Sequence, residues 1–267
     1  MVPAQNIDEV IAQLETIIAN SVASNNRAGY FAALYHKVTC RVKQGIQTKE
    51  FENGARMEQF DVVFANRYIT AYDQWINKEH TQMSQSWQVA FEMAGKSSVL
   101  VLQHLLIGMN AHINLDLGVA VIVVAKEQNL PLADMKNDFN TINTILASLT
   151  YQVVSELDRI SPLLSLAGMH SKNDSLFIQF AMDNARDGAW CFAEELYPKE
   201  NDDFNKLIAG RDKDIWMLGK AIVDTKGLLA ITVWIIHLFE YKIPAKITKI
   251  LNEYKKTYLT VDDLKVK

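Results

Sequence analysis

The sequence predicts an all-α protein, a single-domain multi-helix bundle built around a central buried helix at about residues 97–129. Hydrophobic residues make up 49% of the 267 positions, and there are only 11 glycines and 5 prolines to interrupt helices. Apolar residues recur every three to four positions along almost the whole chain, which is the helical period. No segment shows the alternating, β-branched pattern of a strand. These observations together favour packed helices and no sheet.

Polar, glycine and proline breaks divide the first half of the chain into helices. The breaks fall at 25–26, at the polar 46–56 segment, at 95–96 and at Pro131. Asp134 follows Pro131 closely and suits the first turn of the next helix. The expected helices are 7–23, 28–45, 57–79, 84–95, 97–129 and 133–164.

The second half divides in the same way, at 168–173, Pro198 and Pro244. The Asn-Asp-Asp run at 201–203 offers N-cap residues. The expected helices are 174–197, 204–209, 211–240 and 243–257. No connection has the length or composition of a linker, so residues 1–257 are expected to form one domain, followed by a short charged tail at 258–267.

Charge and composition exclude several classes of protein. The net charge of −4 leaves no basic surplus for binding nucleic acid. The N-terminal residues include acids where a secretion signal needs a basic start and an apolar run, so we expect a cytoplasmic protein. Residues 99–126 approach the length of a membrane span, but their internal polar side chains argue against one.

Those internal polar side chains form two stripes on the predicted central helix. At ~100° per residue, His104, Gly108, His112 and Asp116 follow one another at four-residue steps on one face. The amides of Gln103, Asn110 and Asn114 cluster roughly opposite. Since a buried polar group without a partner costs on the order of 1–3 kcal/mol, each stripe is expected to contact a pocket, a metal or other polar groups.

His112 and Asp116 are the strongest candidates for chemistry, because they lie one helical turn apart, ~6 Å along the axis. Imidazole and carboxylate are ligands for zinc, iron or manganese, and a third protein ligand is then expected from Asp61, His237 or Glu240. Without a metal, the pair is either a general base with its orienting carboxylate or a hydrogen bond that holds only the fold.

Other polar residues are candidates for binding substrate. Arg67, with Asn66 beside it, suits a carboxylate or phosphate, or else a salt bridge to Asp61 or Asp116. His104 lies ~12 Å from His112 along the helix, so it cannot share one ion with Asp116, and it either contacts substrate or bonds a backbone carbonyl. The remaining candidates are Asn110, Asn114 and Trp87. Gly108 either clears room for a ligand or allows close helix packing.

Several enzyme classes lack their signatures in this chain. There is no GxSxG, P-loop, GxGxxG or HExxH motif, and no ExxH pair of the kind that di-iron bundles use. Serine hydrolases, NTPases, dinucleotide-binding enzymes and zincins are therefore not expected.

The segments FDVVFANRYITAYDQW, SWQVAFE and QHLLIGMNAHINLDLGVA resemble a bacterial family of unknown function marked by a QHLLxGMNAHINxDL-type helix. That resemblance is specific over residues 60–125 and implies a shared fold and site, with no activity attached. A weaker resemblance is to all-helical zinc-dependent phospholipase C and P1-type nucleases, in which an HxxxD helix and a later HxxxE helix supply metal ligands. His112 and Asp116 fit the first helix, whereas His237 and Glu240 depart from the second by one residue.

The resulting functional expectation is a small-molecule enzyme in which His112, Asp116 and Arg67 carry the chemistry. Its leading form is a metal-dependent hydrolase acting on an ester or phosphoester. The alternative is a non-hydrolytic enzyme or a binding protein for an apolar, isoprenoid-like ligand. A third is a purely structural polar network.

Overall fold

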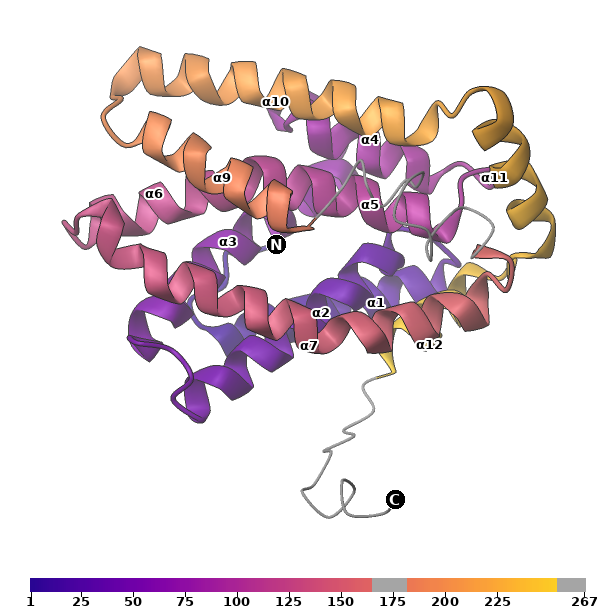
Figure 1. Ribbon diagram of the computed structural model, residues 1–267, viewed down its shortest axis with the longest axis horizontal. Helices are drawn as coiled ribbons and strands as arrows, with labels where there is room; N and C mark the ends of the chain where they lie inside the picture. The colour runs from indigo at the N-terminus through magenta and orange to yellow at the C-terminus, as the bar shows by residue number, and fades with distance from the viewer. Residues whose placement is uncertain (165–181, 254–267) are drawn as a thin grey trace.

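The computed structural model describes residues 1–164 and 182–253, and over these ranges it contains helices and no strand (Figure 1). The all-α prediction is therefore confirmed. The elements are α1 (Ile7–Ala23), α2 (Gly29–Gln47), α3 (Gly54–Ile76), η1 (His80–Gln82), α4 (Gln85–Ala94), α5 (Val101–Ala111), η2 (His112–Leu117), α6 (Gly118–Glu127), η3 (Leu132–Met135), α7 (Lys136–Ile160), α9 (Met182–Leu196), α10 (Asn201–Val223), α11 (Gly227–Phe239) and α12 (Pro244–Asn252).

The predicted central helix is present as one continuous rod, α5–η2–α6, and it is the core of the bundle. Helices α2 and α3 contact it on one side, α4 and α10 on another, and α9 packs along its second half. Residues Val101–Glu127 are long and apolar enough to cross a membrane by length and composition, but 83% of their most apolar window is buried inside the protein. Burial by neighbouring helices accounts for this apolar character.

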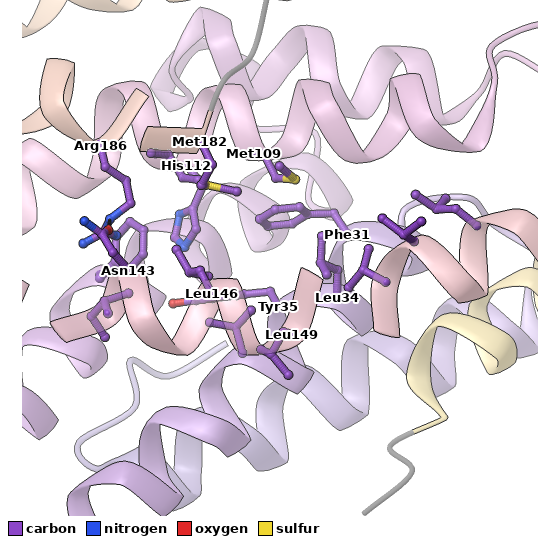
Figure 2. Close-up of a pocket in the computed structure, with 17 residues that line it drawn as sticks. Phe31, Leu34, Tyr35, Met109, His112, Asn143, Leu146, Leu149, Met182 and Arg186 are labelled. Carbon is purple, nitrogen blue, oxygen red and sulfur yellow. Dashed lines mark hydrogen bonds between the residues drawn. The ribbon is translucent and has the colours of Figure 1, made fainter. Parts of the chain in front are cut away.

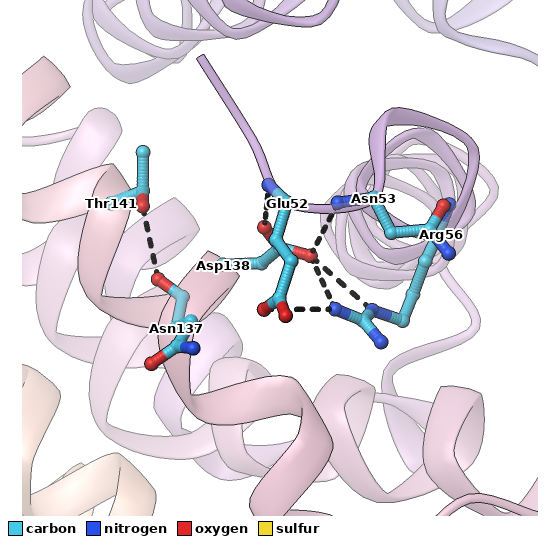
Figure 3. Close-up of polar contacts among 6 residues, drawn as sticks. All are labelled: Glu52, Asn53, Arg56, Asn137, Asp138 and Thr141. Carbon is cyan, nitrogen blue, oxygen red and sulfur yellow. Dashed lines mark hydrogen bonds and ion pairs between the residues drawn. The ribbon is translucent and has the colours of Figure 1, made fainter. Parts of the chain in front are cut away.

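Two aspartates on distant helices cap the starts of other helices and so fix how the bundle packs. Asp138 of α7 accepts hydrogen bonds from the backbone N–H groups of Glu52 and Asn53 at 2.7 and 3.3 Å, and its carboxylate pairs with Arg56 at 2.7 Å (Figure 3). Asp212 of α10 accepts from two backbone N–H groups in the first turn of α4. Each aspartate satisfies N–H groups that a helix start leaves open.

The predicted break at 210 and the predicted helix 211–240 are wrong. Helix α10 runs unbroken through Gly210, which has no neighbour close to the position of a Cβ, and ends at Val223. The break lies at 224–226, where Gly227 takes a positive φ of 61° that favours glycine. Asp212 therefore lies in the middle of a helix, and its role is to cap α4 rather than to compensate the start of its own helix.

Gly108 permits close helix packing, one of the two outcomes expected from the sequence. A Cβ at this position would lie 2.6 Å from the ring of Phe31 on α2. Gly118 likewise permits close packing against α9, because a Cβ there would lie 2.7 Å from the carbonyl oxygen of Ala189. The two glycines let the flanking helices approach the core helix, and Phe31 is thereby held beside His112.

Candidate functional site

A cavity of about 360 Å³ lies between α2, α5–η2 and α7 and reaches α9 at one end. Most of its wall is apolar, from residues such as Leu34, Val38 and Leu149. The polar side chains on the wall are Tyr35, His112, Asn143 and Arg186. In the view of Figure 2, His112, Asn143 and Arg186 lie on one side, while Phe31 and Leu34 lie toward the other. The cavity is thus apolar over most of its surface with a few polar groups, which is the usual character of a small-molecule site.

His112 lies on the cavity wall with its two ring nitrogens in different surroundings. Nδ1 lies 3.5 Å from the Asp116 carboxylate, while Nε2 is buried and has no hydrogen-bond partner among the described residues. The ring of Phe64 stacks on the imidazole at a centroid distance of 3.6 Å, and Tyr35 meets it edge-on. With an ionised Asp116, Nδ1 carries the proton and Nε2 is left as the basic nitrogen.

Asp116 is held on three sides, so it fixes the orientation of His112. Arg67 Nε donates to its Oδ1 at 2.7 Å, and the indole N–H of Trp87 donates to its Oδ2 at 2.7 Å. The Asp116 side chain is almost fully buried, whereas Arg67 remains partly exposed. Of the two salt bridges considered for Arg67, the one to Asp116 is present. A carboxylate fixed in this way is the orienting member of a histidine dyad.

The local backbone around this dyad is unusual. Residues His112–Leu117 form a π-helical turn between two α-helical segments. A π-turn widens the helix by one residue, and such turns are frequent at functional sites. Here the turn carries both His112 and Asp116, and both side chains lie in the protein interior.

The electrostatics of the dyad favour a neutral imidazole beside a charged carboxylate. Burial lowers the pKa of His112, although the hydrogen bond and the charge of Asp116 oppose that shift. For Asp116, burial raises the pKa, but Arg67, His112 and Trp87 together outweigh it and leave the pKa below its usual value. Neutral His112 is then a base at physiological pH.

Arg186 adds a positive charge to the cavity wall from α9. Its guanidinium donates to the side chain of Asn143 and, at 2.6 Å, to the carbonyl of Phe139, and it lies over the Phe139 ring. Because Arg186 is nearly fully buried, its charge acts in a low-dielectric setting. A carbonyl or carboxylate oxygen of a ligand is the acceptor that suits such a donor.

Two of the amides predicted to contact substrate lie on the other side of the core helix, against α10. Asn110 donates to the carbonyl of Ile215 at 2.8 Å, and Asn114 donates to Asn110 at 3.0 Å. Gln103 of the same stripe donates to the carbonyl of Ile222. Neither Asn110 nor Asn114 lines the cavity, so the geometry supports a structural role, because both amides serve to join α10 to the core helix.

The other predicted substrate contacts also have structural partners. Asn66 bonds the backbone N–H and C=O of Ala4, which ties the N-terminal segment to α3. Trp87 contacts Asp116 and does not line the large cavity. His104 lines a separate small cavity, with Tyr30 edge-on to its ring, and burial lowers its pKa to about 3.

The five residues expected to bind a metal do not meet in one place. His237 and Glu240 line a different cavity at the start of α5, where Glu240 accepts from Val101 N–H and Ser161. Asp61 is buried on α3, and one of its oxygens has no partner in the described residues. Over residues 1–164 and 182–253, no group of three or more His, Cys, Asp or Glu is placed to hold an ion. His112 and Asp116 alone do not supply the three ligands a metal site needs.

For Arg186, as for Arg67, the sequence leaves open either the binding of a carboxylate or phosphate or a salt bridge, and it does not place Arg186 on the wall of this cavity. A buried ion pair close to the wall was also missed from the sequence. Lys37 of α2 and Glu156 of α7 pair at 2.6 Å, and Gln152 also donates to Glu156. Lys37 lies in the largely apolar segment AALYHKVT. A lysine in such a segment could have indicated a buried ion pair. His170 and the expected helix residues 174–181 lie outside the described residues, as does the tail at 258–267.

Comparison with known proteins places the chain in a family. The profile of a family of unknown function (DUF5995) matches residues 7–225. The chain belongs to this family. The match spans α1 to the end of α10, so it includes every wall of the large cavity together with Arg67, His112 and Asp116. Searches of the curated proteins and of the solved structures each found no match.

Proposed function

We propose that this protein binds a small apolar molecule bearing a carbonyl or carboxylate group in the large cavity, and that His112 acts on it as a general acid–base. The observation that carries the proposal is the buried Nε2 of His112, which lies on the cavity wall without a partner while Asp116 orients the opposite side of the ring. Buried polar atoms almost always have partners, so an orphaned imidazole nitrogen at a cavity favours a ligand there.

The chemistry that this arrangement supports is proton transfer. Nε2 would take a proton from the ligand or from a water molecule beside it, and the positive charge that forms on the ring would be stabilised by Asp116. Arg186 would hold a developing or resident negative charge on the ligand oxygen. The apolar wall would bind the body of the ligand and keep water out.

Ester or phosphoester hydrolysis with a divalent zinc, iron or manganese ion stays a prediction, as does the weaker resemblance to zinc-dependent phospholipase C. Both oxygens of Asp116 are engaged by Arg67 and Trp87, and His237 and Glu240 line another cavity. The donor set of the described residues therefore does not fit a resident metal. Metal analysis of protein purified without a chelator tests this directly, since a stoichiometric ion lost in His112→Ala would restore the metal-dependent interpretation.

Binding in the cavity is tested with a fluorescent polyene fatty acid, which combines an apolar chain with a carboxylate. Val153→Trp places a large side chain into the cavity and is expected to weaken binding more than tenfold. Val63→Trp is the matched control, because Val63 is also a half-buried valine on a helix but does not line this cavity. Absence of binding to the wild-type protein, or equal loss in both variants, would refute the binding proposal.

The acid–base role is tested separately with a medium-chain p-nitrophenyl ester. His112→Gln is expected to lower turnover by roughly 10²-fold or more while changing fatty-acid affinity less than threefold. His104→Gln is the matched control, since His104 is buried on the same helix but lines a different cavity. If the wild-type protein binds the fatty acid but does not turn over the ester, the result supports a binding protein and counts against the acid–base role.

A further inference from the structure

Helix α11 has an apolar outer face that the rest of the fold does not use. Its buried side chains are Val233 and Ile236, which point inward. Leu228, Ile231, Trp234 and Leu238 follow at steps of three and four residues and are exposed, with Trp234 60% exposed. Phe239, the last residue of α11, is also exposed, and Tyr241 and Ile243 continue this surface past the end of the helix. The outer face of a helix at the surface of a protein is normally polar, so a run of this size marks an interaction surface.

Positive charge gathers at the C-terminal end of this face. Residues 241–252 contain three lysines, at 242, 246 and 249, and no acid, whereas Lys226 at the other end pairs with Asp224 at 3.6 Å. Glu240 is buried and accepts hydrogen bonds from Val101 N–H and from Ser161, whereas the lysines lie at the surface. The solvent therefore meets an apolar helix with three lysines beyond its C-terminal end.

A polar cavity of about 200 Å³ lies at the C-terminal end of α11. Arg27 and Lys242 both contribute to its lining, with Ser97 beside them. Burial and the positive charge of Arg27 lower the pKa of Lys242, while the charge of Glu240 opposes that shift. Glu240 and His237 line the same cavity. Since Glu240 already accepts hydrogen bonds from Val101 N–H and Ser161, Arg27 and Lys242 are the charged donors there that suit a phosphate group.

We propose that α11 binds the surface of an anionic phospholipid bilayer. Its apolar face, including Trp234 and Phe239, would lie among the acyl chains near the headgroups, and the lysines would contact the anionic headgroups. At 13 residues α11 is only about 20 Å long, too short to cross a bilayer. It also meets α10 at a bend of 68°, so the two helices do not form one straight span (Figure 1).

The experiment is co-sedimentation of the full chain with vesicles of phosphatidylcholine alone or with about one third phosphatidylglycerol. The wild-type protein is expected to bind the phosphatidylglycerol vesicles and to lose affinity as salt is raised. Ile231→Glu is expected to weaken binding more than tenfold. Ile76→Glu is the matched control with an expected change below twofold, because Ile76 on α3 is 54% exposed and Ile231 is 56% exposed. Circular dichroism checks that both variants fold.

The lysines are tested with the double variant Lys242→Gln/Lys246→Gln. About fivefold loss per lysine is expected on phosphatidylglycerol vesicles. Lys206→Gln, an exposed lysine near the start of α10, is expected to change affinity less than twofold. A blue shift of tryptophan fluorescence on binding, reduced in Trp234→Phe, reports insertion of α11 itself.

Several results would overturn the proposal. One is no binding to either vesicle, which is also the result expected if residues 165–181 or 254–267 of the same chain cover α11. Another is a concentration-dependent dimer that Ile231→Glu abolishes, with no vesicle binding, since α11 would then be an interface between two copies. A third is equal loss of binding in the Ile231 and Ile76 variants. None of these outcomes depends on whether the large cavity binds a ligand.

Discussion

The two sides of the core helix α5–η2–α6 differ in how well their polar groups are satisfied. Toward α10, the amides of Gln103, Asn110 and Asn114 each donate a hydrogen bond, two of them to backbone carbonyls of α10. On the side of α2 and α3, the Nε2 atoms of His104 and His112 have no partner among the described residues. The first side has the polar groups of an interface between helices. The second has polar groups that the fold alone does not satisfy, and of the two histidines only His112 lies on the wall of the large cavity, which is why we propose a ligand beside it.

Neighbouring side chains extend the unsatisfied region beyond the core helix. Tyr68 Oη and Asp61 Oδ2, both on α3, are buried without a hydrogen-bond partner in the part of the chain that the structure describes. Burial raises the pKa of Asp61 to about 7 and also raises the pKa of Tyr68. Removing a polar group on the α10 side should therefore lower the free energy of unfolding, because a hydrogen bond is lost. Removing an unpartnered polar group on the side of α2 and α3 should raise it. The exception on that side is a group such as a carboxylate whose removal leaves a charged partner unpaired.

The largest effect is expected from Asp116→Ala, which removes such a partner charge. Arg67, Trp87 and His112 would all lose the carboxylate that they contact, and breaking a buried ion pair typically costs about 4 kcal/mol. Urea unfolding measures the loss. Asp212→Ala on the α10 side is the comparison, because Asp212 accepts only from backbone N–H groups and should cost about 1–2 kcal/mol. Equal losses would show that Asp116 is no more than a cap-like structural acceptor.

The next largest effect is a gain in stability in Asp61→Asn, and it depends on pH. The folded protein keeps Asp61 protonated up to about pH 7, whereas the unfolded chain ionises it near 3.8. The unfolded state therefore binds fewer protons in this window, and wild-type stability falls as pH rises through it. The asparagine side chain of the variant does not titrate, so the variant should be more stable by about 4 kcal/mol at pH 8.

At pH 3.5 the same variant should be within about 0.5 kcal/mol of the wild type, because Asp61 is then largely protonated in both states. Urea unfolding at the two pH values measures the difference. Asp73→Asn is the control, since Asp73 on the same helix is partly exposed and pairs with the N-terminus. A gain that is the same at both pH values would show that the ionisation of Asp61 is not its cause.

On the α10 side, Asn110→Ala is expected to lower stability by about 2 kcal/mol. Asn110 is fully buried, and its loss leaves the carbonyl of Ile215 and the amide of Asn114 without their partner. Thr141→Ala is the control, because Thr141 is half-buried and its hydroxyl bonds only a carbonyl of its own helix. We expect that control to change stability by less than about 0.5 kcal/mol. A loss of that small size in Asn110→Ala would mean that the amide face does not hold α10.

The angular pattern of the sequence predicted that the core helix carries two polar stripes and that they face different parts of the protein. It did not predict their roles, because a stripe of asparagines is equally suited to a substrate and to the carbonyls of a neighbouring helix. The partner of Asn110 is Ile215, 105 positions away, and only the packing of α10 brings the two together. The predicted break at Gly210 obscured that packing, since a helix ending there would not reach Ile215 in the same orientation.

The candidate site, like the two polar stripes, was predictable from the sequence only in part. The pairing of His112 with Asp116 follows from residue types and spacing, whereas the ion pair of Arg67 with Asp116 was one of several alternatives that the sequence left open. The π-turn does not, because it is a change of backbone winding that residue periodicity does not reveal. Arg186 belongs to a helix about 70 positions later. The five residues expected to bind a metal do not meet, because α11 places His237 at the opposite end of α5 from His112. Long-range packing decided each of these outcomes.

The smallest effect is expected from Tyr68→Phe, and its sign tests whether the second side of the core helix is unsatisfied. The Tyr68 side chain is fully buried, and its hydroxyl has no partner among the described residues. Removing the hydroxyl takes away a desolvated group and leaves the ring in place, so the variant should be more stable by about 1 kcal/mol. Tyr197→Phe is the matched control, because the Tyr197 hydroxyl donates to the carbonyl of Leu130 and its removal should cost up to about 0.5 kcal/mol. Thermal and urea unfolding measure both changes. A loss of stability in Tyr68→Phe would mean that its hydroxyl has a partner in solution, and the contrast between the two sides of the core helix would then rest on the histidines and Asp61 alone.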